Sequence, residues 1–113
     1  MSSGGDDKSG TSRQGQPAAT VARREVEIVN QRGLHARAAA KFAKLADELG
    51  GEILVTGNGM TVSGLSIMGL MLLAAGPGTR IEIAVAGAAA EQSVASLAAL
   101  VEAGFDEDQA PPR

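Results

Sequence analysis

The chain has 113 residues, is 44% hydrophobic and carries a formal net charge of −3, which predicts one small soluble domain without the basic face that nucleic-acid binding requires. It has no cysteine and a single histidine, which excludes disulfides and thiolate chemistry and argues against a zinc site. No pattern in the sequence points to a resident metal or cofactor, and the composition fits a cytoplasmic location.

Composition divides the chain into three parts. Residues 1–22 are rich in glycine, serine and other polar residues, and we predict a disordered leader there. Residues 23–108 carry the patterned apolar residues of a domain, and residues 109–113 are expected to form a flexible C-terminal tail. The leader lacks the basic and apolar regions of a signal peptide, and no apolar run is long enough to cross a bilayer. We therefore expect no membrane insertion.

The first predicted strand and helix flank a short loop. Alternation in Glu25–Val29 predicts a strand whose Val26 and Ile28 point inward. Gly33 frees the backbone for a turn, and a helix begins at about His35, which places this side chain at or near the N-cap. Apolar residues then recur at helical spacing until the glycine pair at 50 and 51: Ala39, Phe42, Ala43, Ala46 and Leu49.

Strands and helices alternate through the rest of the domain. Asn58-Gly59 predicts a two-residue hairpin, and Gly104 ends the last helix. In chain order, the predicted elements are a strand at Glu52–Thr56, a strand at Met60–Ser63, a helix at Ser66–Ala75, a strand at Thr79–Ala86 with Ile81, Ile83 and Val85 inward, and a helix at Ala88–Ala103. The order β-α-β-β-α-β-α belongs to the α+β class, and one sheet with helices on a single face would bury these patterns.

His35 is the only histidine, and it is expected where a strand has ended and a helix begins. A helix N-terminus presents unpaired N–H groups and the positive end of the helix dipole, which together favour a phosphate group. Arg37 adds a guanidinium that suits phosphate oxygens. These residues predict a histidine that accepts and holds a phosphoryl group. By themselves they also allow a capping histidine beside a solvated arginine.

The predicted helix at Ser66–Ala75 has two notable features. Ser66 is expected to cap the helix, and a phosphate on this hydroxyl would also be favoured by the helix N-terminus. The helix is too apolar to bury all its side chains against one sheet, and exposed methionines suit a surface that meets several partners. The alternative is a helix that is buried on all sides.

Three blocks carry a resemblance to a known family. Gly33–Arg37, followed by the alanines at 39 and 40, resembles the active-site signature of the HPr family of phosphocarrier proteins of the PEP-dependent phosphotransferase system. Val62–Met71 resembles the regulatory-serine segment of that family, and Gly104–Asp108 is similar to the C-terminal end of its nitrogen-related branch, NPr. The resemblance covers roughly residues 24–108. One departure is Ala38, which stands where the family usually has proline; its absence loosens the first helical turn but removes no reacting group.

The resemblance implies an open-faced β-sandwich, with a four-stranded antiparallel sheet and three helices on one face. It also implies a phosphocarrier, which is a reusable co-substrate rather than an enzyme. Enzyme I, loaded from PEP, would pass a phosphoryl group to Nδ1 of His35, and Arg37 with the first helix amides would stabilise it. A protein of the EIIA type would then receive the group on its own histidine.

The resemblance further implies regulation and docking on the second helix. Ser66 would be the target of an HPr kinase/phosphorylase. Ile67, Met68 and Met71 would form the surface that meets partner proteins.

Two other functions remain open from the sequence, as does the branch of the family. One is a regulatory interaction domain of the same fold, which acts by docking and by phosphorylation of Ser66 without phosphoryl relay. The other is a small-molecule sensor on a ferredoxin-like βαββαβ sheet, which the Gly33–Arg37 block disfavours. The serine block favours the sugar-transport branch and the C-terminal block favours the nitrogen-related branch, toward which we lean.

Overall fold

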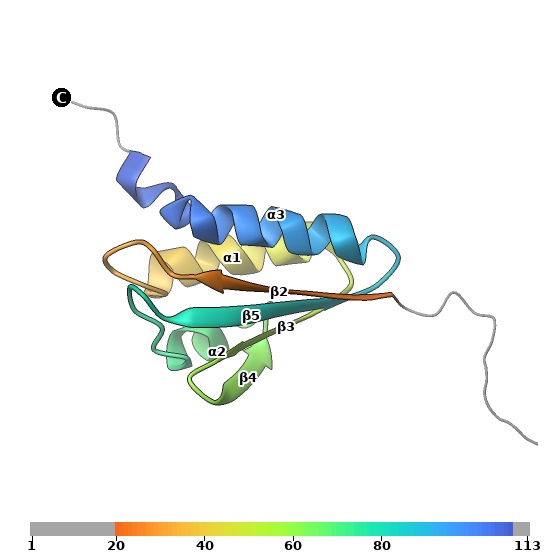
Figure 1. The fold of residues 1–113 in the computed structure, drawn as a ribbon, viewed down its shortest axis with the longest axis horizontal. Coiled ribbons are helices and arrows are strands. Elements are labelled where there is room, and N and C mark those ends of the chain that lie inside the picture. Colours follow the sequence, from red (N-terminus) through yellow and green to blue (C-terminus); the bar gives the residue numbers. More distant parts are fainter. Residues whose placement is uncertain (1–19, 110–113) are drawn as a thin grey trace, which may run out of the picture.

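The computed structural model describes residues 20–109, which form one sheet and its covering helices (Figure 1). The elements are β2 (Val21–Glu27), α1 (Ala36–Leu49), β3 (Glu52–Gly57), β4 (Met60–Ser63), α2 (Ile67–Leu72), β5 (Arg80–Ala86) and α3 (Ala90–Glu102), followed by a 3₁₀ segment at Gly104–Gln109 that we call the C-terminal segment. The predicted order β-α-β-β-α-β-α is confirmed.

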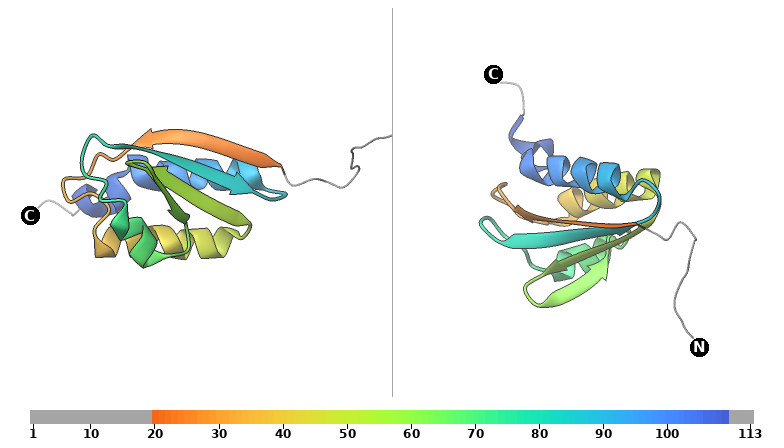
Figure 2. Two further views of the ribbon diagram at one scale, coloured as in Figure 1. Left: turned by 90° about the horizontal axis from the view of Figure 1, so that it is seen from below. Right: turned by 45° about the vertical axis from the view of Figure 1, so that its right-hand side comes forward.

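The four strands form one antiparallel sheet in the order β2-β5-β3-β4. Helices α1 and α3 lie beside each other over this sheet, and α2 packs against α1 and β4 (Figures 1 and 2). No helix of the described residues 20–109 covers the other face of the sheet (Figure 2). This is the open-faced sandwich, with three helices against a four-stranded antiparallel sheet, that the resemblance implies.

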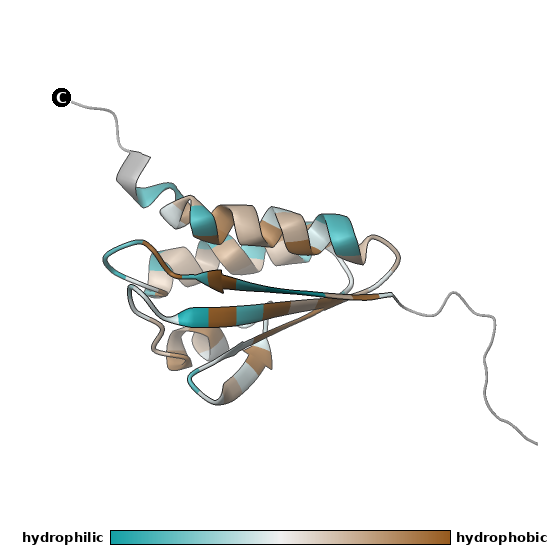
Figure 3. Cartoon of the chain, in the orientation of Figure 1, coloured by the Kyte–Doolittle hydropathy of each residue, from teal (hydrophilic) through white to brown (hydrophobic). Residues whose placement is uncertain are grey.

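The core lies between the sheet and the helices because apolar residues alternate along the strands. In β5 the side chains of Ile81, Ile83 and Val85 are at most 1% exposed, as predicted, and the alternation along this strand is visible in Figure 3. Phe42 of α1 and Phe105 of the C-terminal segment are both fully buried, so the two aromatic side chains of the protein are both in the core.

The first strand begins earlier than the pattern indicated. The strand was predicted at Glu25–Val29, but β2 starts at Val21, which is also two residues before the predicted domain start at 23. The reason is that Val21 pairs with Ala86 at the end of β5. β2 ends at Glu27, but Val26 and Ile28 are buried as predicted. The predicted leader at 1–22 otherwise falls on residues 1–19, and most of the predicted tail falls on residues 110–113; both lie outside the described residues.

Helix α2 is shorter than the predicted range Ser66–Ala75, because tertiary contacts end it. Leu73 is its C-cap, and Ala74 adopts a left-handed conformation with φ 52°. The side chain of Asn58 donates to the carbonyl of Leu73 at 2.8 Å and satisfies a helix-end acceptor. Helix α3 likewise begins later than predicted, since the residues after Gly87 form a turn before Ala90.

Candidate functional site

The loop before α1 is fixed against the segment that follows α2. The backbone N–H of Leu34 donates to the carbonyl of Ala75 at 3.0 Å. Gly33 has φ +66°, and a Cβ there would lie 2.3 Å from the oxygen of Ala75, so only glycine fits this close approach. His35 follows as the N-cap of α1, as the sequence predicts, with φ −75° and ψ −179°. The backbone that carries the His35 ring is therefore held in place by the contacts of Gly33 and Leu34 with Ala75.

The two nitrogens of the His35 ring have different partners. Nδ1 accepts a hydrogen bond from the backbone N–H of Arg37 at 3.3 Å, so it presents a lone pair toward the helix N-terminus. Nε2 is hydrogen-bonded to Oε2 of Glu107. A carboxylate can only accept, so Nε2 carries the proton and Nδ1 is the free, nucleophilic nitrogen. The side chains of His35 and Glu107 are 17% and 15% exposed, so the pair sits just below the surface.

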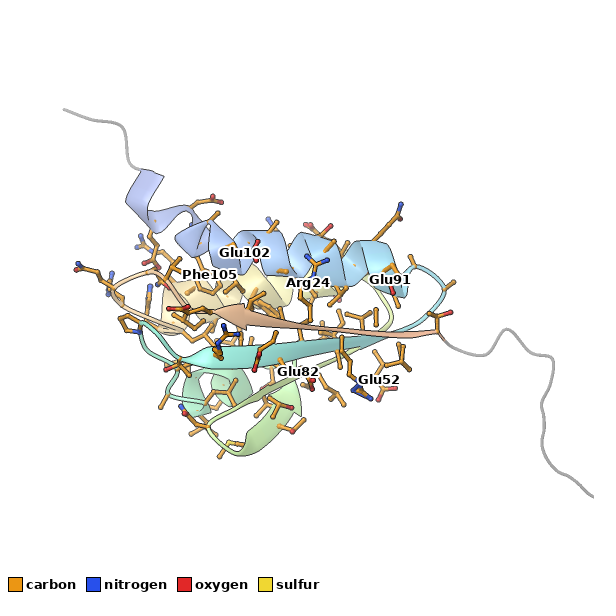
Figure 4. All side chains as sticks on the ribbon, in the orientation of Figure 1. Arg24, Glu52, Glu82, Glu91, Glu102 and Phe105 are labelled. Atoms are coloured by element: carbon orange, nitrogen blue, oxygen red, sulfur yellow. The ribbon has the colours of Figure 1, made fainter. Side chains whose placement is uncertain are left out.

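Glu107 reaches the histidine because the C-terminal segment is anchored on the core. Figure 4 labels Phe105 at the C-terminal end of α3, and its side chain is fully buried. Phe105 and Asp106 both adopt left-handed backbone conformations, with φ 56° and 62°, which turn the chain back toward α1. The Nζ of Lys41 donates to the carbonyl of Phe105 at 2.7 Å. Helix α1 thus holds the segment that supplies the carboxylate.

Asn30 links this carboxylate to the loop. It is completely buried, and its Nδ2 donates to the carbonyl of Gly33 at 2.9 Å and to Oε1 of Glu107 at 3.1 Å. Burial acts to raise the pKa of Glu107, but the hydrogen bonds from His35 and Asn30, with the electrostatic effect of His35 and Arg32, outweigh it and hold the pKa below the ordinary glutamate value. Glu107 is therefore an ionised acceptor at neutral pH.

Arg37 lies in the first turn of α1, and its side chain is exposed. The first turn of α1 contains no acidic residue, so positive potential from the helix dipole and from Arg37 meets solvent beside the ring of His35. An anion beside the ring would face the amides of the first turn, and Arg37 adds a cation to the same turn. The two residues that the sequence singled out are linked in the structure by the bond from the backbone N–H of Arg37 to the ring of His35.

Ser66 caps α2 as predicted, and its Oγ accepts from the backbone N–H of Gly69 at 2.9 Å. Beyond the cap, four apolar side chains of α2 face solvent: Ile67, Met68, Met71 and Leu72 are 43%, 68%, 40% and 61% exposed, and the first three are those that the resemblance singled out. Leu70 is fully buried, so this helix divides its side chains between the core and the surface. The alternative of a helix buried on all sides is wrong.

A family model described as "PTS HPr component phosphorylation site" matches residues 22–103. The chain belongs to the HPr family of phosphocarrier proteins. Members of the HPr family carry a phosphoryl group as relay intermediates and are not enzymes, which places this chain among phosphocarriers of the phosphotransferase system.

The relatives are similar over the whole domain. The chain is 42% identical to the phosphocarrier protein HPr of Neisseria meningitidis, over 77% of this chain and 98% of that protein. It is 41% identical to the phosphocarrier protein NPr of Shewanella violacea, over 78% of this chain and 97% of that protein. The crystal structure of HPr from Thermoanaerobacter tengcongensis superposes with a TM-score of 0.72 at 34% identity, over 76% of this chain and 97% of that one. Both HPr and NPr proteins are thus among its relatives.

Sequence reasoning missed Asn30 and Glu107 as parts of the site. Asn30 opens the loop that leads to His35, but nothing in the sequence tells a buried asparagine from a solvated one. Glu107 lies within the C-terminal block, 72 residues from His35, and only the fold brings the two together. A carboxylate this far along the chain leaves no local pattern.

One hollow on this HPr-family domain lies away from the histidine. It has a volume of about 200 Å³, opens on the uncovered face of the sheet, and is lined by Val21, Arg23, Glu52, Leu54 and Ala84 to Ala86. Residues 20–109 contain no group of three side chains that could hold a metal ion. None of their helices is long and apolar enough to cross a membrane.

Proposed function

We propose that Nδ1 of His35 accepts a phosphoryl group from a phosphohistidine of Enzyme I, which is itself loaded from PEP, and later gives it to a histidine of an EIIA-type protein. In the first step the Nδ1 lone pair forms a bond to phosphorus while the bond from phosphorus to the donor nitrogen breaks, and that electron pair returns to the donor. In the second step a ring nitrogen of the EIIA histidine forms a bond to phosphorus while the bond from phosphorus to Nδ1 breaks, and that electron pair returns to Nδ1. No base or metal is needed, since transfer relies on positioning and charge stabilisation.

The observation that carries this proposal is the orientation of the ring of His35. Its Nδ1 points at the N–H of Arg37, in the first turn of a 14-residue helix. A phosphoryl group on Nδ1 would be held by this amide, by the amide of Ala36 and by the guanidinium of Arg37. Membership in the HPr family supports the same chemistry, as does the similarity to HPr of Neisseria meningitidis and to NPr of Shewanella violacea.

We place partner docking on the exposed side chains of Ile67, Met68 and Met71, because α2 packs against α1 and the chain just after α2 is bonded, through the carbonyl of Ala75, to the loop that leads to His35. Phosphorylation of Ser66, by a kinase/phosphorylase where one is present, would add negative charge to this surface. We also propose a cytoplasmic location and, from the GFDED block at Gly104–Asp108, a role in the nitrogen-related system.

The test is incubation with PEP and Enzyme I, followed by intact-mass measurement and a check of acid lability. The wild-type protein should gain one acid-labile phosphoryl group. His35→Ala should gain none, whereas the matched control Ser66→Ala should be labelled like the wild type. A label that survives in His35→Ala would move the site to another residue. No label on folded wild-type protein would favour the regulatory docking domain over the relay.

A further inference from the structure

We propose that Glu107, itself oriented by Asn30, is a positioning residue that keeps the proton of His35 on Nε2 and so leaves Nδ1 free to accept the phosphoryl group. This inference rests on the proposed function of His35 and extends it to two residues that the sequence did not single out. Neither of them touches the phosphoryl group; they act through the imidazole ring.

The hydrogen bonds form one chain whose direction is fixed. Nδ2 of Asn30 has two hydrogens, which face the carbonyl of Gly33 at 2.9 Å and Oε1 of Glu107 at 3.1 Å. With the amide turned over, Oδ1 would face two oxygen acceptors, so this orientation is the only one that fits. Oε1 of Glu107 is thus occupied by Asn30, and Oε2 is left to accept from Nε2 of His35.

The carboxylate is held in place independently of the histidine. Phe105 is 0% exposed, and the bond from Lys41 to the Phe105 carbonyl ties the turn to α1. Arg32 is the nearby cation that favours the ionised form of Glu107. Because this carboxylate is held rigidly, it favours the tautomer of His35 that carries its proton on Nε2.

The same arrangement suits the charge that develops during transfer. When the Nδ1 lone pair binds phosphorus, the ring gains positive charge while the proton stays on Nε2. The carboxylate of Glu107 faces this proton and stabilises the charge, as the buried aspartate does for histidine in serine proteases. No proton has to enter or leave the site in either direction of transfer.

Glu107→Gln tests the inference because the donor of Asn30 restricts how a glutamine can bind. Its amide oxygen must face Nδ2 of Asn30, since an NH₂ group there would oppose another donor. Its NH₂ group then faces Nε2 of His35 and makes that nitrogen the acceptor, which moves the proton to Nδ1. We expect phosphorylation of His35 by Enzyme I to slow about 10- to 100-fold.

Glu107→Ala is the matched control that separates tautomer selection from simple support. It removes the carboxylate but forces no tautomer, so we expect a smaller loss than in Glu107→Gln, less than about tenfold. A merely structural role predicts the reverse order, because glutamine keeps the shape of glutamate. In Asn30→Ala/Glu107→Gln the glutamine can turn its oxygen to His35, so the rate should recover relative to Glu107→Gln alone.

The ring itself provides a readout that does not depend on activity. In ¹⁵N-labelled protein, the imidazole shifts should show the proton on Nε2 in the wild type and on Nδ1 in Glu107→Gln. A wild-type proton on Nδ1 would overturn the inference, even if Glu107→Gln failed to fold. So would equal transfer rates for the wild type and a folded Glu107→Gln. Wild-type protein that takes no phosphoryl group from PEP and Enzyme I would instead overturn the proposed function, while the ring shifts still tested the role of Glu107.

Discussion

Two helix N-termini in this domain are capped by residues that we expect to carry phosphate, and they are built differently. At α1, the ring of His35 accepts from the N–H of Arg37 at 3.3 Å and is bound on its far side by Glu107. At α2, the hydroxyl of Ser66 accepts from the backbone N–H of Gly69 at 2.9 Å, and no side chain among residues 20–107 is hydrogen-bonded to it. The capping side chain of α1 is therefore held by a second residue, Glu107, whereas the capping side chain of α2 bonds only to its own helix.

This difference suggests what separates a carrier site from a regulatory one. A carrier must return its phosphoryl group, so its acceptor atom is kept in one protonation state and one orientation by residues on three elements. These are Asn30 in the loop, Lys41 in α1 and Glu107 in the C-terminal segment. A regulatory hydroxyl needs only exposure to a kinase and a surface on which new charge matters. The exposed apolar side chains of α2 supply such a surface.

The comparison is tested most severely by Arg37→Ala. The side chain of Arg37 is exposed, so the fold should be kept, but the phosphoryl group would lose the guanidinium of Arg37. Removal of a single stabilising donor of this kind slows a transfer by about 10²–10³-fold. Rapid-quench measurement of transfer from Enzyme I gives the rate, and Arg37→Lys is the control that keeps the charge without the planar donors. An unchanged rate in Arg37→Ala would show that the helix amides suffice.

A smaller effect is expected from Ser66→Asp. The added charge lies beside the docking side chains rather than at His35, so transfer from Enzyme I should weaken by about tenfold or less, through slower association. Ser66→Asn is the matched control, since it keeps a capping side chain without the charge. The two variants should differ most at low salt. Equal rates for both would argue against control by charge at this cap.

The smallest effect concerns stability and pH. Burial would raise the pKa of Glu107, but its bonds to His35 and Asn30 outweigh this and lower the pKa below the ordinary value of 4.5. A lowered carboxyl pKa adds stability that is complete above the unfolded-state value and is lost as pH falls through the folded-state value. The wild type should therefore exceed Glu107→Gln in free energy of unfolding at about pH 6, and this excess should shrink toward about pH 3. Urea unfolding at both values measures it; a constant difference would contradict the prediction.

Local sequence patterns predicted most of the fold. The alternation at Ile81, Ile83 and Val85 and the helical spacing from Ala39 to Ala46 each specify which side of an element is buried, whatever it packs against. Turn glycines and the Asn58-Gly59 hairpin then set where the elements end. The end of α2 was predicted less well, since the side chain of Asn58 and the backbone of Leu34 decide it from elsewhere in the chain.

For the site, the sequence by itself determined that a histidine caps a helix, with an arginine two residues on, because capping and the helix dipole act within one turn. It likewise determined that Ser66 caps α2 and that α2 cannot bury all its apolar side chains. The family resemblance implied Nδ1 as the acceptor, but only the tertiary structure shows the physical reason why Nδ1 of His35 is the free nitrogen. That depends on Glu107, which arrives from 72 residues away once Phe105 is buried in the core, and no local pattern encodes such a contact.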